Sequence, residues 1–219
     1  MKYFPDVSDY DMTKTGGMAL YLAHCDLDPL LGLIEQTEKV LSETRKQYSQ
    51  LSCTANNRGD FRTQSLYSDL EGVFISKIVP LSYESLLLII ASRLEEAFKT
   101  WCRIIKAKDE SLPSLHEYKC GNHGDLDKPI AYIKEYGHVE GIKADPLWES
   151  IIAIWIARNG IIHHGGYIEP KQHEKLKKHQ IGVNPEDCRV YLESKAVKQL
   201  YKAVVDFIDR VFLLEPIGE

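Results

Sequence analysis

Residues 145–166, DPLWESIIAIWIARNGIIHHGG, constrain the fold more than any other stretch of the chain. Apolar side chains recur at helical spacing through the first half of this stretch. Asp145 and Pro146 suit the start of a helix, and Gly165 and Gly166 permit the left-handed turn that ends one. At roughly 1.5 Å per residue, about 20 residues form a rod about 30 Å long, which crosses a small domain. The sequence therefore predicts a central helix.

Hydrophobic periodicity predicts most of the other elements as well. We expect helices over residues 28–51, 83–106 and 128–136, and a last helix that Ser194 caps and that continues to about residue 212. We also expect a short helix near 18–24 and partial helicity over 170–181. Residues 52–64 and 109–126 are polar and rich in turn formers, which predicts loops. Two short strands, 181–183 and 189–192, flank an Asn-Pro turn. The expected fold is an all-α, up-and-down helical bundle with loop insertions and a small β-hairpin.

Composition narrows the class of protein. The chain has 219 residues, 44% hydrophobic and 27% charged, as expected of one globular domain over residues 1–219. Its net charge of −5 provides no global positive field for nucleic acid, so an anionic substrate needs a local basic patch. We expect neither a signal peptide nor a membrane span, because no apolar run is long enough. Five widely spaced cysteines form no disulfide framework and favour a cytoplasmic protein.

Polar side chains end the otherwise apolar central helix. Arg158, Asn159 and His163 fit the pattern R-N-x-x-x-H, and His164 follows. Histidine titrates near neutrality and can take or give a proton, while arginine offers a planar fork of donors to a phosphate. Asn159 lies four residues before His163, on nearly the same face, and could orient its ring. These residue types suit RNA cleavage, in which the 2′-hydroxyl attacks the adjacent phosphorus without needing a metal.

In this setting the motif resembles that of the HEPN superfamily (higher eukaryotes and prokaryotes nucleotide-binding). Members are all-α bundles with the motif near the end of a long helix, and many are metal-independent ribonucleases of toxin or antiviral defence systems. The stretch LLLIIASRLEEAF resembles the family's paired helix, in which an acidic residue supports the site, so Glu95 is a better candidate than Glu96. The resemblance covers roughly residues 80–213. It leaves an N-terminal helix and loops over residues 1–79 unassigned.

The resemblance implies Arg158, Asn159, His163 and Glu95 as catalytic residues, RNA as the partner and no cofactor. Two alternatives stay open. In the first, Arg158 and Asn159 only cap or cross-link the helix end, and both histidines are cations favoured by the helix dipole. In the second, the chain is a non-catalytic HEPN-like module that binds a nucleotide, RNA or a protein. A toxin would also have an antitoxin or regulatory protein as a partner.

A basic run follows the motif and is a candidate for binding RNA phosphates. It consists of Lys171, Lys175, Lys177 and Lys178, to which His164 can add. The alternative for such a run is a solvated helix face. Cys120 and His123 have the spacing of a ligand pair, but no second tight pair accompanies them, so we expect no metal site.

The spacing of the motif also predicts a homodimer. Arg158 and His163 are five positions apart and diverge by about 140° on an ideal helix. One chain therefore presents a spread pair, whereas two motif helices facing each other across a two-fold axis would gather two arginines and two histidines at one cleft. Ile161, Ile162 and Tyr167 could supply apolar contact at that axis. HEPN-like ribonucleases are likewise thought of as dimers with a composite site.

Overall fold

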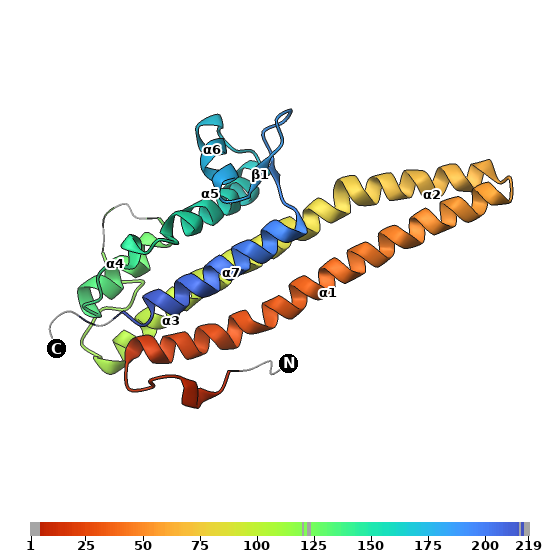
Figure 1. Cartoon of the computed structure of the whole chain (residues 1–219). Coiled ribbons are helices and arrows are strands. Elements are labelled where there is room, and N and C mark those ends of the chain that lie inside the picture. The colour runs from red at the N-terminus through yellow and green to blue at the C-terminus, as the bar shows by residue number, and fades with distance from the viewer. Residues whose placement is uncertain (1–4, 120, 122–123, 215, 217–219) are drawn as a thin grey trace.

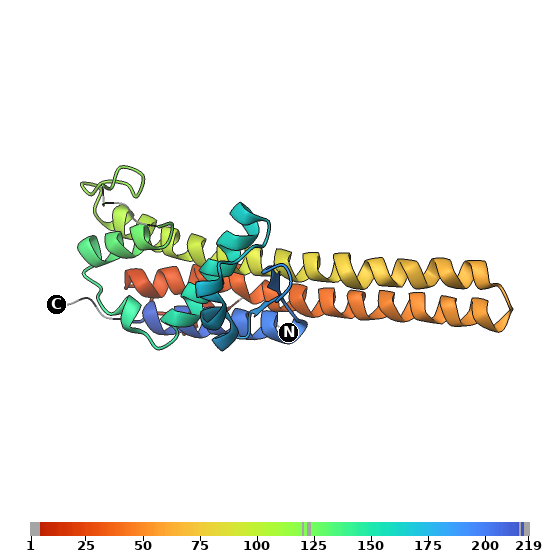
Figure 2. The ribbon, with the colours of Figure 1, turned by 90° about the horizontal axis from the view of Figure 1, so that it is seen from above.

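Two long antiparallel helical rods determine the length of the molecule (Figures 1 and 2). The structure, a computed structural model, describes residues 5–119, 121, 124–214 and 216. The first rod is α1 (Thr15–Asn57), preceded by a 3₁₀ turn at Val7–Asp9. The second is a continuous run of α2 (Phe61–Val73), a π-helical segment η2 (Phe74–Ile78) and α3 (Val79–Lys108). Only Arg58, Gly59 and Asp60 separate the rods.

Shorter elements pack on one half of these rods (Figure 2). They are α4 (Asp127–Tyr136), a 3₁₀ turn (Ile142–Ala144), α5 (Trp148–His164), α6 (Pro170–Lys178), β1 (Gly182–Val183), β2 (Val190–Tyr191) and α7 (Ser194–Val211). The strands pair in antiparallel register, with Gly182 opposite Tyr191 and Val183 opposite Val190. Helix α7 lies beside α1 and α3, and α5 crosses this layer. The all-α class and the small hairpin expected from the sequence are confirmed.

One buried apolar core joins these helices. Its largest fully buried side chains include Trp101, Phe98 and Phe207. Phe212 packs on Trp101 and Phe98, with ring centroids 4.5 and 5.3 Å apart. The N-terminal half of α1 belongs to the same core, through residues such as Leu27 and Ile34. The packing unit is therefore larger than residues 80–213, the range of the family resemblance.

The sequence misplaced the ends of both rods. The first begins at Thr15, not at residue 28, and continues through Pro29. It does so because apolar residues before the proline are buried against the core, and this offsets the hydrogen bond that proline cannot donate. The predicted loop over 52–64 is also wrong, because residues 52–57 are helical and α2 begins at Phe61.

The short connection carries its own signals. Gly59 adopts a positive φ of 73°, and the Asp60 carboxylate accepts a hydrogen bond from the Thr63 amide at 3.1 Å. These are the ordinary end of one helix and the N-cap of the next. The second rod therefore starts 22 residues before Tyr83, the first residue of the helix expected from periodicity.

Elements near the motif agree better with expectation. Helix α4 ends at Gly137, and α6 occupies most of the partly helical stretch 170–181. Helix α5 starts at Trp148, later than the sequence suggested: its N-cap is Leu147, so Asp145 and Pro146 precede the helix, and the Asp145 carboxylate accepts a hydrogen bond from the Leu147 amide at 2.8 Å. The sequence suggested that Ser194 is the N-cap of α7, and this is wrong. Ser194 is the first helical residue, and its hydroxyl donates to Glu38 of α1.

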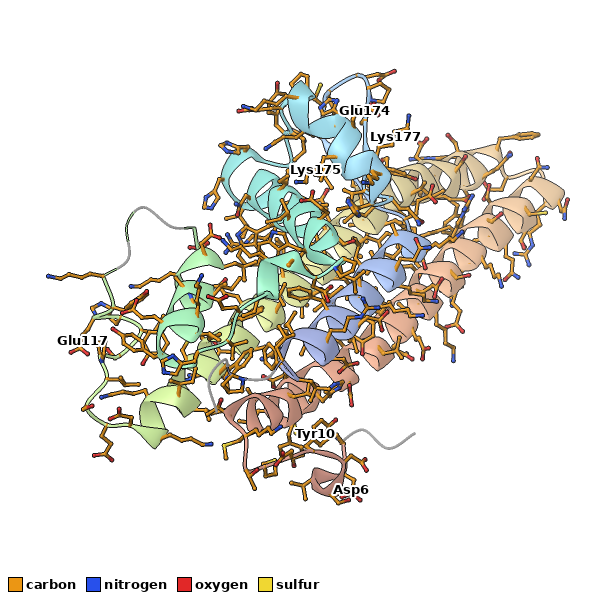
Figure 3. All side chains as sticks on the ribbon, turned by 60° about the vertical axis from the view of Figure 1, so that its left-hand side comes forward. Asp6, Tyr10, Glu117, Glu174, Lys175 and Lys177 are labelled. Carbon is orange, nitrogen blue, oxygen red and sulfur yellow. The ribbon has the colours of Figure 1, made fainter. Side chains whose placement is uncertain are left out.

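A partly buried imidazole joins α1 to α7. His24 Nε2 lies 2.7 Å from Asp209 Oδ1, and His24 Nδ1 lies 2.9 Å from Asp28 Oδ1. Tyr10, from the N-terminal segment, stands over the same ring at 5.9 Å between centroids (Figure 3). Hydrogen bonding to Asp209, then to Asp28, raises the pKa of His24 to about 9 against the opposing effect of burial. The protonated imidazole therefore bridges two helices with two carboxylates.

This bridge predicts that stability falls in mild alkali. A group whose pKa is higher in the folded state contributes its full stabilisation below its unfolded pKa, about 6.5, and loses it as the pH rises through 9. At about 1.4 kcal/mol per pKa unit, the loss between pH 6 and pH 10 is at most about 3 kcal/mol. We expect urea midpoints to fall over this range in the wild type and much less in His24→Gln. His164→Gln, at an exposed position, should behave as the wild type does. An equal decline in His24→Gln would contradict this role of His24.

Candidate functional site

Helix α5 presents the motif from a tightly packed position. Its buried face consists of Ile151, Ala153, Ile154, Ala157 and Gly160, which pack toward α3 and α7. Gly160, inside the motif, has no room for a side chain, because a Cβ there would lie 2.4 Å from Ile168 Cδ1 and 3.1 Å from the Tyr167 carbonyl oxygen. The end of the motif helix is therefore fixed against the segment that follows it.

The helix ends as the sequence predicted. Gly165 and Gly166 have positive φ angles of 58° and 90°, and the Gly166 amide donates to the Gly160 carbonyl at 2.8 Å. This closed turn feeds directly into the hairpin, because the Gly166 carbonyl accepts from the Val190 amide at 2.9 Å. The hairpin thus holds the C-terminal end of α5.

Arg158 is the centre of a polar cluster between α5, α3 and the loop before α4. Its Nη1 donates to Asn159 Oδ1 at 2.7 Å and to Asp125 Oδ2 at 3.3 Å, and its Nη2 lies 3.8 Å from Glu95 Oε2. The guanidinium also stands over the Trp155 ring, 5.1 Å from its centroid. The Arg158 and Glu95 side chains are 18% and 17% exposed, so the ion pair is shielded from bulk water.

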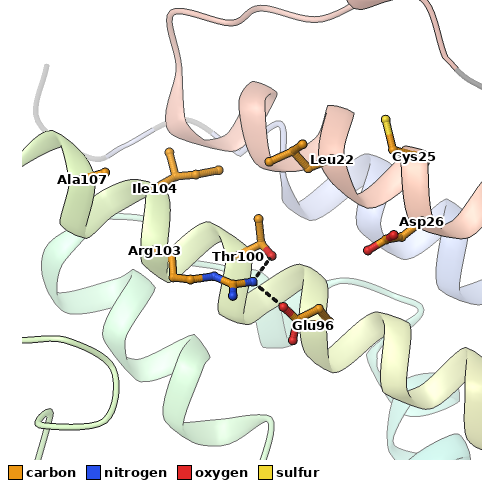
Figure 4. A pocket seen from close by; sticks show the side chains of 8 residues that line it. All are labelled: Leu22, Cys25, Asp26, Glu96, Thr100, Arg103, Ile104 and Ala107. Atoms are coloured by element: carbon orange, nitrogen blue, oxygen red, sulfur yellow. Dashed lines mark hydrogen bonds and ion pairs between the residues drawn. The ribbon is translucent and has the colours of Figure 1, made fainter.

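The structure directs the two adjacent glutamates of α3, Glu95 and Glu96, to different partners. Glu95 faces Arg158 and also pairs with Lys99 at 2.5 Å. Glu96 instead pairs with Arg103, which also donates to Thr100, beside a cavity of about 540 Å³ between α1 and α3 (Figure 4). Glu95 is therefore the one of the two that lies at the motif, as expected.

Asn159 does not act as the sequence suggested. Its side-chain oxygen accepts from Arg158, and no hydrogen bond joins it to His163 among the described residues. The four-residue spacing puts the Asn159 and His163 side chains on one side of α5. The Arg158 guanidinium, however, is the stronger donor and lies next to the Asn159 side-chain amide. Asn159 therefore positions the guanidinium instead of the imidazole.

His163 and His164 stand apart from this cluster. Both are exposed in the last turn of α5, with their ring centroids 6.4 Å apart. The described residues give His163 no hydrogen bond and no ion pair, so its ring is accessible to a ligand. Ile162 and Tyr167 beside it are 48% and 45% exposed, whereas Ile161 packs on the core. One chain therefore presents its arginine and its histidine separately.

The basic run on α6 is partly neutralised (Figure 3). Lys171 pairs with Glu169 at 2.6 Å, and Lys175 pairs with Glu149 of α5 at 2.7 Å. Lys177 and Lys178 are exposed and have no ion pair among the described residues. These two remain the better candidates for contacts with phosphates.

Two residues at the site carried no sequence signal. Asp125 lies in the irregular stretch before α4, where no periodicity or motif marks it. Arg189, on the hairpin, lies across from Tyr167 in an isolated β-bridge and packs beside Gly166. Its side chain is 64% exposed, which adds a cation near the histidine end of α5.

No group of three or more His, Cys, Asp or Glu side chains within the described ranges is arranged to hold a metal ion. Cys120 and His123, the ligand pair considered from the sequence, lie outside those ranges. A second large cavity, about 550 Å³, lies at the end of the bundle between the start of α1 and residues 212–214 and 216, away from the motif. Neither large cavity contains Arg158 or His163.

Comparison of the chain with protein-family models, with curated proteins and with solved structures finds no match. The site is therefore interpreted from its chemistry. A guanidinium held beside carboxylates can exchange one of them for a phosphate, since both groups present two anionic oxygen acceptors to its fork of N–H donors. An accessible imidazole can transfer protons near neutral pH.

Proposed function

We propose that this chain is a metal-independent endoribonuclease of the HEPN type, acting as a toxin or an antiviral defence effector. The observation that carries the proposal is the placement of Arg158 against Glu95, the acidic partner that the resemblance implied. The exposed imidazole of His163 at the end of the same helix supports it. Lys177 and Lys178, on the neighbouring helix, would add phosphate contacts.

In the proposed reaction, the RNA supplies its own nucleophile. A base removes the proton of the 2′-hydroxyl, its oxygen bonds to the adjacent phosphorus, and the bond from phosphorus to the 5′-oxygen breaks. An acid then protonates that oxygen, which leaves a 2′,3′-cyclic phosphate and a 5′-hydroxyl. His163 performs one or both proton transfers, and Arg158 stabilises the charge on the phosphate oxygens. Glu95 and Asn159 hold the guanidinium in place.

The separation of Arg158 from His163 favours a composite site. A homodimer with its two motif helices face to face would bring the arginine of one chain near the histidine of the other. The exposed Ile162 and Tyr167 lie where such a contact would form. In this arrangement the phosphate bridges two chains.

A second candidate is a binding module without catalysis. It is favoured by the number of acceptors already around Arg158, which are Asn159, Asp125 and Glu95. A guanidinium so fully occupied also serves as a cross-link between α5 and α3. Such a module would bind a nucleotide, RNA or a protein partner without cleaving it.

We expect purified protein to cleave mixed RNA in the presence of EDTA, leaving cyclic phosphate ends. His163→Ala should lower the rate by about 10²- to 10⁴-fold, the usual contribution of one general acid or base. His116→Ala is the matched control, because this histidine is also exposed and lies outside the motif and the basic run, and it should keep most of the activity. The measurement is a denaturing gel, with end-group analysis of the products. Wild-type activity in a folded His163→Ala protein, or cleavage that returns only with added Mg²⁺, would refute the assignment.

A mixing experiment tests the composite site. Arg158→Lys and His163→Ala should each be inactive as homodimers, because a point charge does not replace the arginine fork. Unfolding and refolding them together gives mixed dimers in which one of the two sites has both native residues, so about a quarter of the wild-type activity should return, since half of the dimers are mixed. If both residues act within one chain, every mixture stays inactive.

A further inference from the structure

One half of the two rods projects beyond all the shorter elements (Figures 1 and 2). We call this projection the arm and define it as residues 37–57 of α1 together with α2 and η2. Helix α2 has no buried residue, and the buried residues of the arm in α1 are Leu41 and Ala55. At its base Glu38 bonds to Ser194 and Lys198 of α7, and beyond that point the shorter elements do not extend over the arm (Figures 1 and 2).

The seam between the two helices of the arm is largely polar. It includes an ion pair between Arg45 and Glu71 at 3.8 Å and a hydrogen bond from the Ser52 hydroxyl to the Gln64 carbonyl at 3.4 Å. The main apolar contact is that of Tyr48 with Phe74, whose ring centroids lie 5.8 Å apart. Helices gain most of their stability in proteins by packing an apolar face. The seam alone therefore gives the two helices of the arm little stabilisation from apolar packing.

The apolar side chains of α1 point elsewhere. Leu33, Val40 and Leu51 are 43%, 48% and 44% exposed. At about 100° per residue they lie within about 20° of one another, and the seam side of the helix lies about 90° away. They form one exposed stripe along α1, in which Thr44 and Gln47 lie between Val40 and Leu51.

The second rod has a matching stripe. Leu66, Leu70 and Val73 are 55%, 39% and 56% exposed, and they lie about 110° from the seam residues of α2 at about 100° per residue. The π-helical segment then inserts one extra residue into a turn, since its hydrogen bonds span five residues. Ile78 and Leu81, 46% and 58% exposed, therefore continue the same stripe.

Both stripes lie on one face of the arm. On each helix, a rotation of about 90–110° in the direction in which the residue number increases leads from the stripe to the seam. Because the two helices are antiparallel and face each other at the seam, both stripes point to the same side of the arm. A groove of about 370 Å³ confirms this, because Val40 and Thr44 border it from α1 and Ile78 and Ser82 from the second rod. The arm thus resembles half of a four-helix bundle, with an inner seam and an open apolar face.

We propose that this face binds the same face of a second copy of the chain. Two helices about 10 Å wide and about 30 Å long offer roughly 600 Å² in outline. Leu33 and Leu81, beyond the ends of the arm as defined, extend that area toward the roughly 800 Å² per partner of a standard interface. Because the same face would be used by both copies, the two chains would be related by a two-fold axis, the commonest symmetry of oligomers.

Charge favours this occupant over an anionic one. Residues 37–78 carry six Lys and Arg and five Asp and Glu, so the arm has no basic excess for nucleic acid or anionic lipid. The helical run Phe61–Lys108 is long and apolar enough to cross a membrane, and a lipid surface is the rival occupant in the test. The proposal does not depend on the ribonuclease function.

The test compares two double variants of the full-length chain by light scattering. Val40→Lys with Leu66→Lys places two charges on the apolar face. Ser42→Lys with Ser68→Lys adds the same charges two residues further along each helix, about 200° round, at positions that are also exposed. Lysine is a good helix former, and circular dichroism checks the fold of both.

The arm interface is separate from the motif-helix dimer proposed above. We therefore expect the mass in solution to fall by a factor of two in the first variant, from tetramer to dimer if the motif helices also pair and from dimer to monomer if they do not, and to stay at the wild-type value in the second. Equal masses in all three proteins would overturn the proposal. So would a wild-type chain that is monomeric in solution and floats with phosphatidylcholine–phosphatidylserine vesicles, a result that would assign the face to lipid.

Discussion

The packing of α5 against α3 and α7 is the constraint on which the candidate site depends. Small residues on the buried face of α5, such as Ala153, Ala157 and Gly160, allow the helix to lie close to its neighbours. A Cβ at Gly160 would lie 2.4 Å from Ile168 Cδ1, so the segment that follows the helix also packs closely on it. Because α5 is fixed in this way, Arg158 projects at the edge of the contact and meets Glu95 on α3. The ion pair is a consequence of the packing.

The same geometry explains why the site is divided. Arg158 lies at the shielded edge of the helix contact, and His163 lies more than one turn further on, in the exposed last turn. A single chain therefore holds its cation among carboxylates and leaves its imidazole free. For RNA cleavage, this arrangement requires the two groups to meet through a second chain or through a change at Arg158. Of the two carboxylates that pair with Arg158, Asp125 is the easier one for a phosphate to replace, because its side chain is 56% exposed.

The sequence predicted best where the pattern was local. The end of α5 at Gly165, the end of α4 at Gly137 and the hairpin around Asn184-Pro185 all follow from short signals. It failed for the rods, because the start of α1 depends on burial against distant helices and because the residues around the tip of the arm, 52–64, are mostly polar. The Gly59-Asp60 pair did mark the tip of the arm, but it stood inside a stretch too polar to suggest helices.

For the site, the sequence identified Arg158 and Glu95 as neighbours through the motif and its paired helix. It could not identify Asp125 or Arg189, which reach the motif only through the path of loops that no periodicity constrains. It also assigned Asn159 to the wrong partner. Spacing along a helix shows which residues share a side, whereas the nearest strong donor determines which of them bond.

The central claim is that Arg158 is a phosphate-binding group held in place by exchangeable carboxylates. Its most direct test is the binding of a 2′-O-methyl RNA oligonucleotide, which cannot be cleaved, to Asp125→Asn. Asp127→Asn is the matched control. It removes the same charge only two residues further along the chain, but Asp127 pairs with Lys143 and not with Arg158. The account predicts severalfold tighter binding for Asp125→Asn than for the control. Equal affinities in both variants would show that the guanidinium is only a structural cross-link.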